Sequence, residues 1–148
     1  KIDAKFTQTK YFNFIVRKIL RPAMQQLGIP PFMTIPQQIG YQIVINADGM
    51  TATYPGFLWR LLSSSVVIKQ ESTKEQWFYN LTQPWKHYIP CAHDFSNLLE
   101  RVDWVLQNQG LSKEIAENAT TLAKDYLRPQ YIDYYLVQLI NYQARLVK

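Results

Sequence analysis

The chain has 148 residues, of which 47% are hydrophobic, so it is long enough to bury one core of ordinary size but hardly two. Its formal charge of +5 suits an anionic ligand, but the basic residues are scattered, which argues against the clustered basic stripe of a nucleic-acid-binding protein. Cys91 is the single cysteine, which excludes an internal disulfide and a cysteine-rich zinc site.

The first forty residues are predicted to hold one strand and one helix. Alternating apolar and polar residues predict a short strand over 2–7, and apolar residues at helical spacing predict a helix over 11–27. Pro22 should kink or divide this helix, and Gly28 should end it. The segment that follows, up to Gly40, is predicted to be a loop.

The middle of the chain alternates between strand and helix patterns. Strands are predicted over 41–46, 66–69 and 87–90, and helices over 56–62 and 74–81. Asp48 and Gly49 predict a turn, and Pro55 fits the first position of the helix, with Thr53 or Tyr54 as its cap. This alternation predicts an α/β fold, a Rossmann-like parallel sheet with flanking helices.

From residue 94 onward the pattern is purely helical, which predicts a C-terminal helical extension. Helices are expected over 95–107, 112–127 and 129–147, with Gly110 as the terminator of the first. No linker interrupts the chain, so we expect a single domain over 1–148. Because the chain starts at Lys1 and enters an apolar pattern at once, we expect it to be a piece of a longer protein whose missing part lies upstream.

The loop after the predicted strand over 41–46 is a candidate phosphate site. In open α/β sheets, ligands bind outside the carboxyl ends of the strands. The loop offers small or hydroxyl-bearing residues to a diphosphate, and Arg60 could reach back to it from the helix. The candidate residues of this site are Asp48, Gly49, Thr51, Thr53, Tyr54 and Arg60. A plain strand-to-helix connection would look much the same, and the glycines of a P-loop or a dinucleotide fingerprint are absent, so ATP and NAD are poor candidates.

A second candidate segment follows the predicted strand over 66–69. Lys69, Gln70, Glu71 and Ser72 provide a cation, an amide, a carboxylate and a hydroxyl in a row. A carboxylate at the end of a strand is suited to accept the hydroxyls of a ribose or a hexose. On the residues alone, a polar loop without function is the simpler interpretation.

Neither metal binding nor covalent catalysis has support in the sequence. His87 and His93, the only histidines, lie six residues apart, a spacing that fits no metal motif. No serine has the context of a nucleophile elbow, and Cys91 is expected to be a buried structural thiol. No apolar run approaches the ~20 residues that a membrane-spanning helix needs, so we expect no transmembrane segment in this chain.

Several segments, taken in order, carry a resemblance to one enzyme family. They read YQIVINADG over 41–49, SVVIKQES over 65–72, WFY over 77–79, PWKHYIP over 84–90 and DFSNL over 94–98. In order and spacing they resemble the CAP10-type glycosyltransferases, which include Rumi-type protein O-glucosyltransferases, capsule xylosyltransferases and bacterial lipopolysaccharide-modifying enzymes. Residues 3–6, 115–119 and 126–127 extend the resemblance over nearly the whole chain.

The resemblance implies a GT-B enzyme with two Rossmann-like halves, of which this chain corresponds to the C-terminal, donor-binding half. It implies a UDP-sugar donor, no further cofactor, and an acceptor on protein or glycan that the missing half would bind. The loop after Asp48 and Gly49 would face the donor diphosphate, and the segment from Lys69 to Ser72 would lie near the nucleoside or the sugar. The relatives' catalytic aspartate belongs to the other half, so this chain would hold no catalytic residue and should be inactive by itself.

One departure from the family's pattern bears on the site. Several relatives place an arginine shortly after the loop to pair with the diphosphate, whereas Tyr54, Pro55 and Gly56 occupy that neighbourhood here. Either Arg60 replaces this arginine or the donor is held differently. The alternative function is a non-catalytic α/β interaction module that kept the fold.

The compartment follows from the resemblance only in part. Eukaryotic relatives work in the lumen of the ER and Golgi, and bacterial ones on the cytoplasmic side of the envelope. The lone cysteine and the lack of a C-terminal retention tetrapeptide favour a bacterial cytoplasmic protein.

Overall fold

A computed structural model describes residues 33–49, 51–53 and 55–147. The chain divides into two compact units, Lys1–Gly40 and Tyr41–Lys148. The strand predicted over 2–7 and the helix predicted over 11–27 lie outside the described residues. Within the first unit, the loop prediction before Gly40 is wrong in part, because the one-turn helix α2 spans Ile35–Gln38. The Gln37 side-chain oxygen accepts hydrogen bonds from the backbone N–H and hydroxyl of Thr34, at 2.8 and 3.0 Å, which stabilises this turn.

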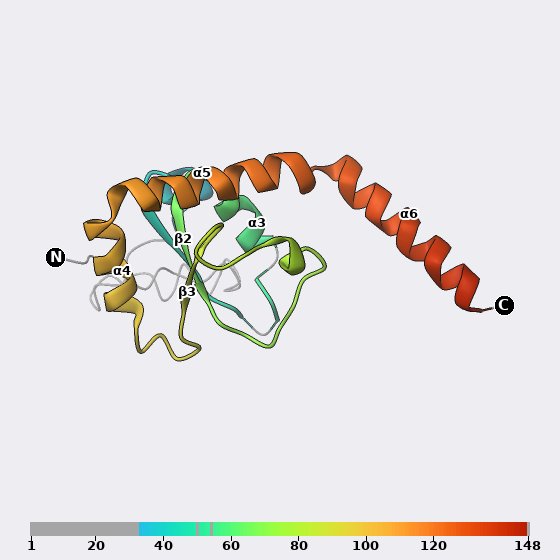
Figure 1. The fold of residues 1–148 in the computed structure, drawn as a ribbon, viewed down its shortest axis with the longest axis horizontal. Helices are drawn as coiled ribbons and strands as arrows, with labels where there is room; N and C mark the ends of the chain where they lie inside the picture. Colours follow the sequence, from blue (N-terminus) through green and yellow to red (C-terminus); the bar gives the residue numbers. More distant parts are fainter. Residues whose placement is uncertain (1–32, 50, 54, 148) are drawn as a thin grey trace, which may run out of the picture. The chain divides into compact units, whose positions relative to one another are not determined.

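The second unit is built on a parallel sheet, as the alternation predicts (Figure 1). In the described part of the chain the sheet has three strands in the order β1-β2-β3: β1 spans Ile43–Asn46, β2 spans Val66–Gln70 and β3 spans Ile89–Cys91. Ile68 lies opposite Ile45 of β1 and Ile89 of β3. The apolar side chains of β2 are buried, which fits a strand covered on both faces.

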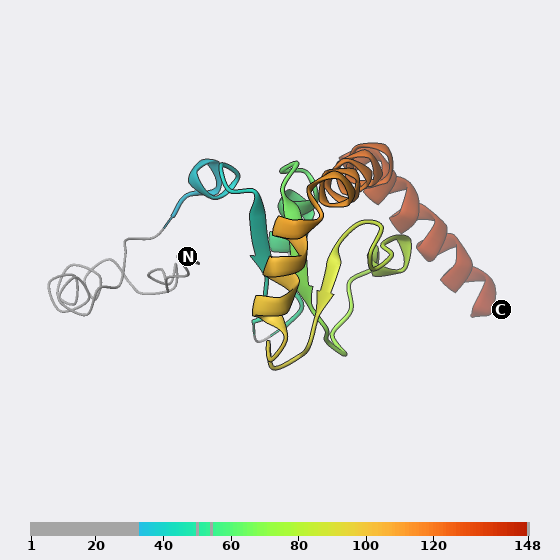
Figure 2. The same ribbon diagram turned by 60° about the vertical axis from the view of Figure 1, so that its left-hand side comes forward.

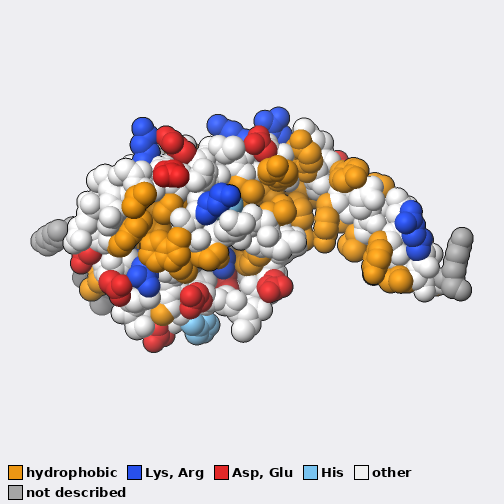
Figure 3. All heavy atoms as spheres, viewed as in Figure 1, with side chains coloured by type: hydrophobic (Ala, Val, Ile, Leu, Met, Phe, Trp, Pro, Cys, Tyr) orange, Lys and Arg blue, Asp and Glu red, His pale blue; other side chains and the backbone are white. Residues whose placement is uncertain are grey.

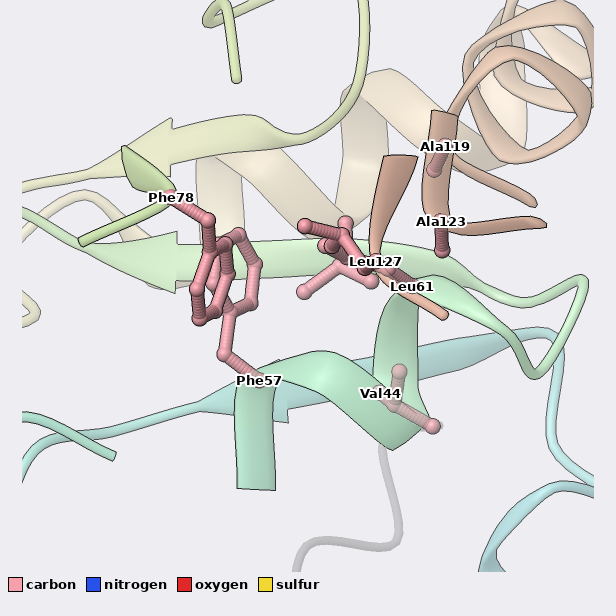
Figure 4. Close-up of a cluster of buried hydrophobic side chains, with 8 residues drawn as sticks. Val44, Phe57, Leu61, Phe78, Ala119, Ala123 and Leu127 are labelled. Carbon is pink, nitrogen blue, oxygen red and sulfur yellow. The ribbon is translucent and has the colours of Figure 1, made fainter. Parts of the chain in front are cut away.

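Helices cover the two faces of this sheet (Figure 2). The short helix α3, Gly56–Leu61, packs on one face, where Phe57 and Phe78 point toward each other (Figure 4). The helix α4, Leu98–Gln107, packs on the other face through Val105. Neighbouring residues of β2 alternate between the two cores, with Val67 in the first and Ile68 in the second.

The long helix α5, Gln109–Tyr126, contributes to both cores. Ala116 packs with the α4 face, while Ala119 and Ala123 pack with the α3 face. The Thr120 hydroxyl donates a hydrogen bond of 3.2 Å to the carbonyl of Leu61, at the carboxyl end of α3. Figure 1 shows α5 crossing above the sheet, at the end where the strands begin. The opposite, carboxyl ends of the strands are therefore left for other contacts.

The last helix, α6, spans Pro129–Leu146, close to its predicted bounds. It has no buried residue. Two aromatic pairs link it to the rest of the second unit: Tyr135 stacks on Trp77 at 4.9 Å between ring centroids, and Tyr131 lies 6.4 Å from Tyr126 of α5. Figure 3 shows hydrophobic side chains along this helix, and shows basic side chains singly or in small groups among acidic ones on the visible face. That view agrees with the scattered charge of the sequence.

The predicted helix over 74–81 is wrong, because only the 3-10 turn η1, Tyr79–Leu81, forms there. Two neighbouring aromatic side chains of this segment have different partners: Phe78 is buried against Phe57, whereas Trp77 stacks on Tyr135. Lys74 is held away from the segment by a hydrogen bond of 2.7 Å from its ammonium group to the carbonyl of Gly49. These tertiary contacts outweigh the local preference for a helix.

Four predicted boundaries also need correction. The first strand begins at Ile43 and not at residue 41. The third strand begins at Ile89, because His87 belongs to a turn in which its backbone N–H bonds to the carbonyl of Gln83 at 3.0 Å. The helix predicted from residue 95 begins at Leu98, since Phe95 has a φ of 60°, outside the helical range. Gly110 is not a terminator but lies in the first turn of α5, and α4 and α5 are separated by Asn108 alone.

Candidate functional site

The candidate site lies at the carboxyl ends of the three parallel strands, where the loops over 47–53, 71–74 and 92–97 begin. Gln70, the last residue of β2, joins all three loops. Its side-chain oxygen accepts a hydrogen bond from the backbone N–H of Asp48 at 2.9 Å, and its side-chain nitrogen donates to the carbonyl of His93 at 2.6 Å. The structure therefore brings the two predicted segments together, and Gln70 serves as the clamp between them.

Asp48 and Thr53 close the loop that follows β1. The Thr53 backbone N–H and hydroxyl donate to Oδ1 of Asp48 at 3.2 and 3.0 Å, and the hydroxyl also reaches the carbonyl of Ala47 at 2.5 Å. Thr53 is thus not the side-chain cap of α3; Pro55 stands at the cap position, and Tyr54, the other predicted cap, lies outside the described residues. The turn fixes the Asp48 carboxylate with its second oxygen, Oδ2, buried.

The environment of Asp48 favours its charged form. Burial acts to raise its pKa, but the Ser72 and Thr53 hydroxyls, the Thr53 N–H and the Lys69 charge together hold the pKa below its usual value. Asp48 is therefore an ionised hydrogen-bond acceptor at neutral pH.

Lys69 is the most enclosed cation of the site, with 7% of its surface exposed. Its ammonium nitrogen lies 4.6 Å from the ring centroid of Tyr79 and 5.7 Å from those of Phe57 and Tyr88. Burial lowers its pKa, and the charges of Asp48 and Glu71 oppose that shift. The aromatic faces stabilise the cation through their quadrupoles, so Lys69 is part of the packing beneath the loops as well as a source of positive charge.

Arg60 reaches back along α3 to the end of β1. Its Nη1 donates a hydrogen bond of 3.3 Å to Oδ1 of Asn46, the last residue of β1, whose side chain is completely buried. The guanidinium also lies over the ring of Trp59, at 4.5 Å from its centroid. Burial lowers the pKa of Arg60 to about 10, and among the described residues no carboxylate forms a salt bridge with it. A half-buried cation without an anionic partner suits an anionic ligand.

Four buried polar atoms within the described ranges have no hydrogen-bond partner, and all four belong to this neighbourhood. They are Asn46 Nδ2, Asp48 Oδ2, Arg60 Nε and Tyr79 OH. Such atoms are rare in folded proteins, because each costs about 1–3 kcal/mol unless a ligand or water satisfies it. Asn46 and Tyr79 are not among the sequence-predicted site residues. The sequence does offer a signal for Asn46, because it is an amide residue at the end of an otherwise apolar predicted strand.

The other predicted residues hold the loops together. The Gly49 carbonyl accepts the Lys74 ammonium at 2.7 Å, and the Ser72 hydroxyl accepts the backbone N–H of Lys74 at 3.0 Å. Thr51 is exposed. Glu71 fixes its backbone by donating its N–H to the carbonyl of Cys91 at 2.8 Å, and its side chain is exposed beside the site.

Cys91 is buried, which confirms its prediction as a structural thiol. Its Sγ donates to Oδ1 of Asn97 at 3.2 Å, and burial raises the pKa of the thiol. In the part of the chain that the structure describes, no group of three or more histidine, cysteine or acidic residues is placed to hold a metal ion. Over the same residues, no helix has the length and apolar character required to cross a bilayer.

Comparison with known proteins identifies the family. The family model of Glycosyl transferase family 90 matches residues 2–148. The chain belongs to this family. The match confirms the predicted membership of the CAP10-like glycosyltransferases and covers the chain almost from end to end.

Family 90 relatives include protein O-glucosyltransferase 3 of Homo sapiens, which is 33% identical over 136 residues, covering 92% of this chain and 25% of the relative. The protein of the same name from Rattus norvegicus is 37% identical over 141 residues, with 94% and 26% covered. The chain thus spans about a quarter of the length of these curated relatives. The crystal structure of Anabaena HepE in complex with UDP has the same fold at a TM-score of 0.65 and 13% identity, over 92% of this chain and 39% of HepE.

Proposed function

We propose that this family 90 chain is the donor-binding part of a glycosyltransferase that moves a hexose or a pentose from a UDP-sugar to a hydroxyl on a protein or a glycan. The observation that carries the proposal is the group of four unpartnered polar atoms on Asn46, Asp48, Arg60 and Tyr79 at the carboxyl ends of the strands. In α/β sheets of this kind, that end is where ligands bind.

The chemistry of these atoms matches the parts of a nucleoside diphosphate sugar. Arg60 Nε and Asn46 Nδ2 are donors, and with the half-buried guanidinium charge they suit the oxygens of a diphosphate. Asp48 Oδ2 is an ionised acceptor, which suits a sugar or ribose hydroxyl. Glu71, exposed at the end of the neighbouring strand, is a second acceptor for hydroxyls.

Two comparisons support a UDP-sugar as the ligand. Anabaena HepE, which shares the fold, has been solved in complex with UDP and with UDP-glucose. The curated relatives are protein O-glucosyltransferases, which favours glucose among the possible sugars. We place the donor of this chain over the same edge of the sheet as the four unpartnered atoms.

The proposed reaction divides between this chain and the remainder of the protein. A base outside this chain takes the proton of the acceptor hydroxyl, whose oxygen bonds to the anomeric carbon while the bond from that carbon to the UDP oxygen breaks. Negative charge then develops on the departing UDP, and Arg60 stabilises it. The acceptor is bound outside this chain, which alone performs no transfer.

Calorimetric titration of the protein with UDP, UDP-glucose, UDP-xylose and ADP tests the proposal. We expect the protein to bind the three uridine nucleotides and to bind ADP more weakly. The ratio of the affinities for UDP-glucose and UDP-xylose reports the preferred sugar. Arg60→Gln and Asp48→Asn should each weaken UDP-glucose by about tenfold or more, as expected for a lost charge-assisted contact. Lys113→Gln, which removes an exposed cation of α5, is the matched control and should bind as the wild type does.

The alternative function, a non-catalytic interaction module, makes the opposite prediction. A folded protein that binds none of these nucleotides would support the module and overturn the donor site. If Arg60→Gln and Asp48→Asn both bind UDP-glucose with wild-type affinity, the proposed function stands. The assignment of Arg60 and Asp48 to the binding site is then overturned.

A further inference from the structure

Gly56, the first residue of α3, is placed against the tip of the Arg60 side chain. A Cβ at Gly56 would lie 2.6 Å from Nη1 of Arg60 and in closer contact still with Cγ2 of Thr53. Separations this short require a neighbour to move. By contrast, a Cβ at Gly49 or Gly110 would meet nothing within 4 Å.

The backbone does not require glycine at this position. The φ of Gly56 lies outside the positive range that favours glycine. Within a helix, glycine is less favourable than alanine because it has more backbone freedom to lose on folding. Space for the Thr53 methyl group and the Arg60 guanidinium is therefore the physical reason for glycine that the structure supplies.

Arg60 uses this space to reach the end of β1. Residues four apart lie one above the other on a helix, and long side chains lean toward the helix N-terminus, so the guanidinium extends over Gly56. There Nη1 donates to Oδ1 of Asn46 at 3.3 Å, while Nε stays unpartnered. Asn46 is fully buried at the end of β1, so its amide gives the guanidinium a hydrogen-bond acceptor at a fixed place.

We propose that Gly56 is a positioning residue for donor binding: it keeps open the space in which the Arg60 guanidinium, hydrogen-bonded to Asn46, is held for the diphosphate. This inference rests on the proposed function, because it assigns the diphosphate end of the donor to that function's site. It predicts that one added methyl group at Gly56 displaces the guanidinium. Binding of ligands that carry a second phosphate should then weaken more than binding of ligands that carry one.

The test uses three variants of the protein and two readouts. Gly56→Ala adds the methyl group; Gly56→Ala combined with Thr53→Ser adds it after removal of the Thr53 methyl, so that the remaining clash is with Arg60. Gly110→Ala is the matched control. The first readout is the Arg60 Nε–H resonance in ¹⁵N NMR without ligand. It should shift in both Gly56 variants and stay unchanged in Gly110→Ala.

The second readout is the ratio of UDP to UMP affinity by calorimetry. We expect this ratio to fall by about tenfold or more in both Gly56 variants, as for the loss of one charge-assisted hydrogen-bonded pair, with little change in UMP affinity. Gly56→Ala should add little in an Arg60→Gln background, because the displaced group is already gone. A general structural effect would instead weaken UMP and UDP alike.

The outcomes separate this inference from the proposed function. If the wild type binds no UDP, both the proposed donor site and the role of Gly56 in binding are wrong. If the wild type binds UDP while the double variant keeps both the wild-type resonance and the wild-type UDP to UMP ratio, the donor site stands and the role of Gly56 is overturned.

Discussion

The side chain of Gln70 joins the backbone of Asp48 to that of His93, through hydrogen bonds of 2.9 and 2.6 Å. Gln70→Ala removes both bonds, so the loops after β1 and β3 lose their common support. We expect a loss of about 1–3 kcal/mol in the free energy of unfolding, since each intramolecular hydrogen bond contributes about 0.5–1.5 kcal/mol. Urea denaturation followed by circular dichroism measures it. Gln107→Ala, at an exposed position of α4, is the control, and equal stability of the two variants would contradict the clamp.

Asn46 allows stability and binding to be separated. Asn46→Asp gives Arg60 a carboxylate partner, so the fold should stay within about 1 kcal/mol of the wild type, but the free Nδ2 donor is lost and the cation is neutralised. We expect UDP affinity to fall by about tenfold or more in calorimetry. Asn46→Leu, which removes the acceptor of Arg60 altogether, should instead lose about 1–3 kcal/mol of stability. Unchanged UDP binding by a folded Asn46→Asp protein would argue against this role.

Tyr79 should make stability depend on pH in the alkaline range. Burial, the negative charge of Asp48 and the neighbouring Tyr88 raise its pKa from 10.0 to about 12. Because the folded-state pKa lies above the unfolded one, this contribution is fully present below pH 10 and is lost as the pH rises toward 12. Tyr79 is only partly buried, so solvent screening reduces the effect to about 1 kcal/mol.

Comparison of Tyr79→Phe with the wild type isolates that contribution. Between pH 10 and 12 the wild type should lose about 1 kcal/mol more stability than Tyr79→Phe in chemical denaturation. Asp48→Asn should lower the pKa of Tyr79 in a tyrosinate absorbance titration, since it removes one of the charges that raise it. Parallel stability curves for the wild type and Tyr79→Phe would count against the raised pKa.

Phe57 supports both the core and the site. It is completely buried, and its ring packs against Phe78, Tyr79 and Tyr88 at centroid distances of 6.0, 5.4 and 5.9 Å. Figure 4 shows the pair of Phe57 and Phe78. Phe57→Ala should cost about 3–5 kcal/mol in thermal or chemical denaturation, from lost burial and the cavity it leaves. Leu111→Ala, which shortens an exposed side chain on α5, should change stability by less than about 0.5 kcal/mol. A loss below about 1 kcal/mol in Phe57→Ala would show that the aromatic cluster adds little.

The sequence was sufficient to predict the parallel sheet and the region of the site. The run Ile43, Val44 and Ile45 and its counterpart Val66 to Ile68 are short, apolar and β-branched, and a turn at Asp48 follows the first of them, so local patterns identify both strands. The position of the candidate site then follows from the rule that ligands lie at the carboxyl ends of parallel strands. The donor-binding role of each predicted residue stays a prediction.

What the sequence could not provide is which side chains meet across the fold. The rings around Lys69 come from residues 57, 79 and 88, and no local pattern reports their convergence. The same contacts explain the error over 74–81, where Phe78 and Trp77 are drawn to different partners. The pairing of Arg60 with Asn46 across fourteen residues is likewise a tertiary contact, visible only once α3 lies on β1.

The position of α5 has a consequence for how such a protein can change. Its alanines at 116, 119 and 123 set the spacing between helix and sheet from the end where the strands begin, far from the loops at their other end. We therefore expect substitutions in those loops to change the ligand preference of the proposed donor site while the scaffold keeps its shape. Bulkier residues on the α5 surface would move both faces of the sheet at once, so the tolerance of the chain to mutation should differ sharply between its two ends.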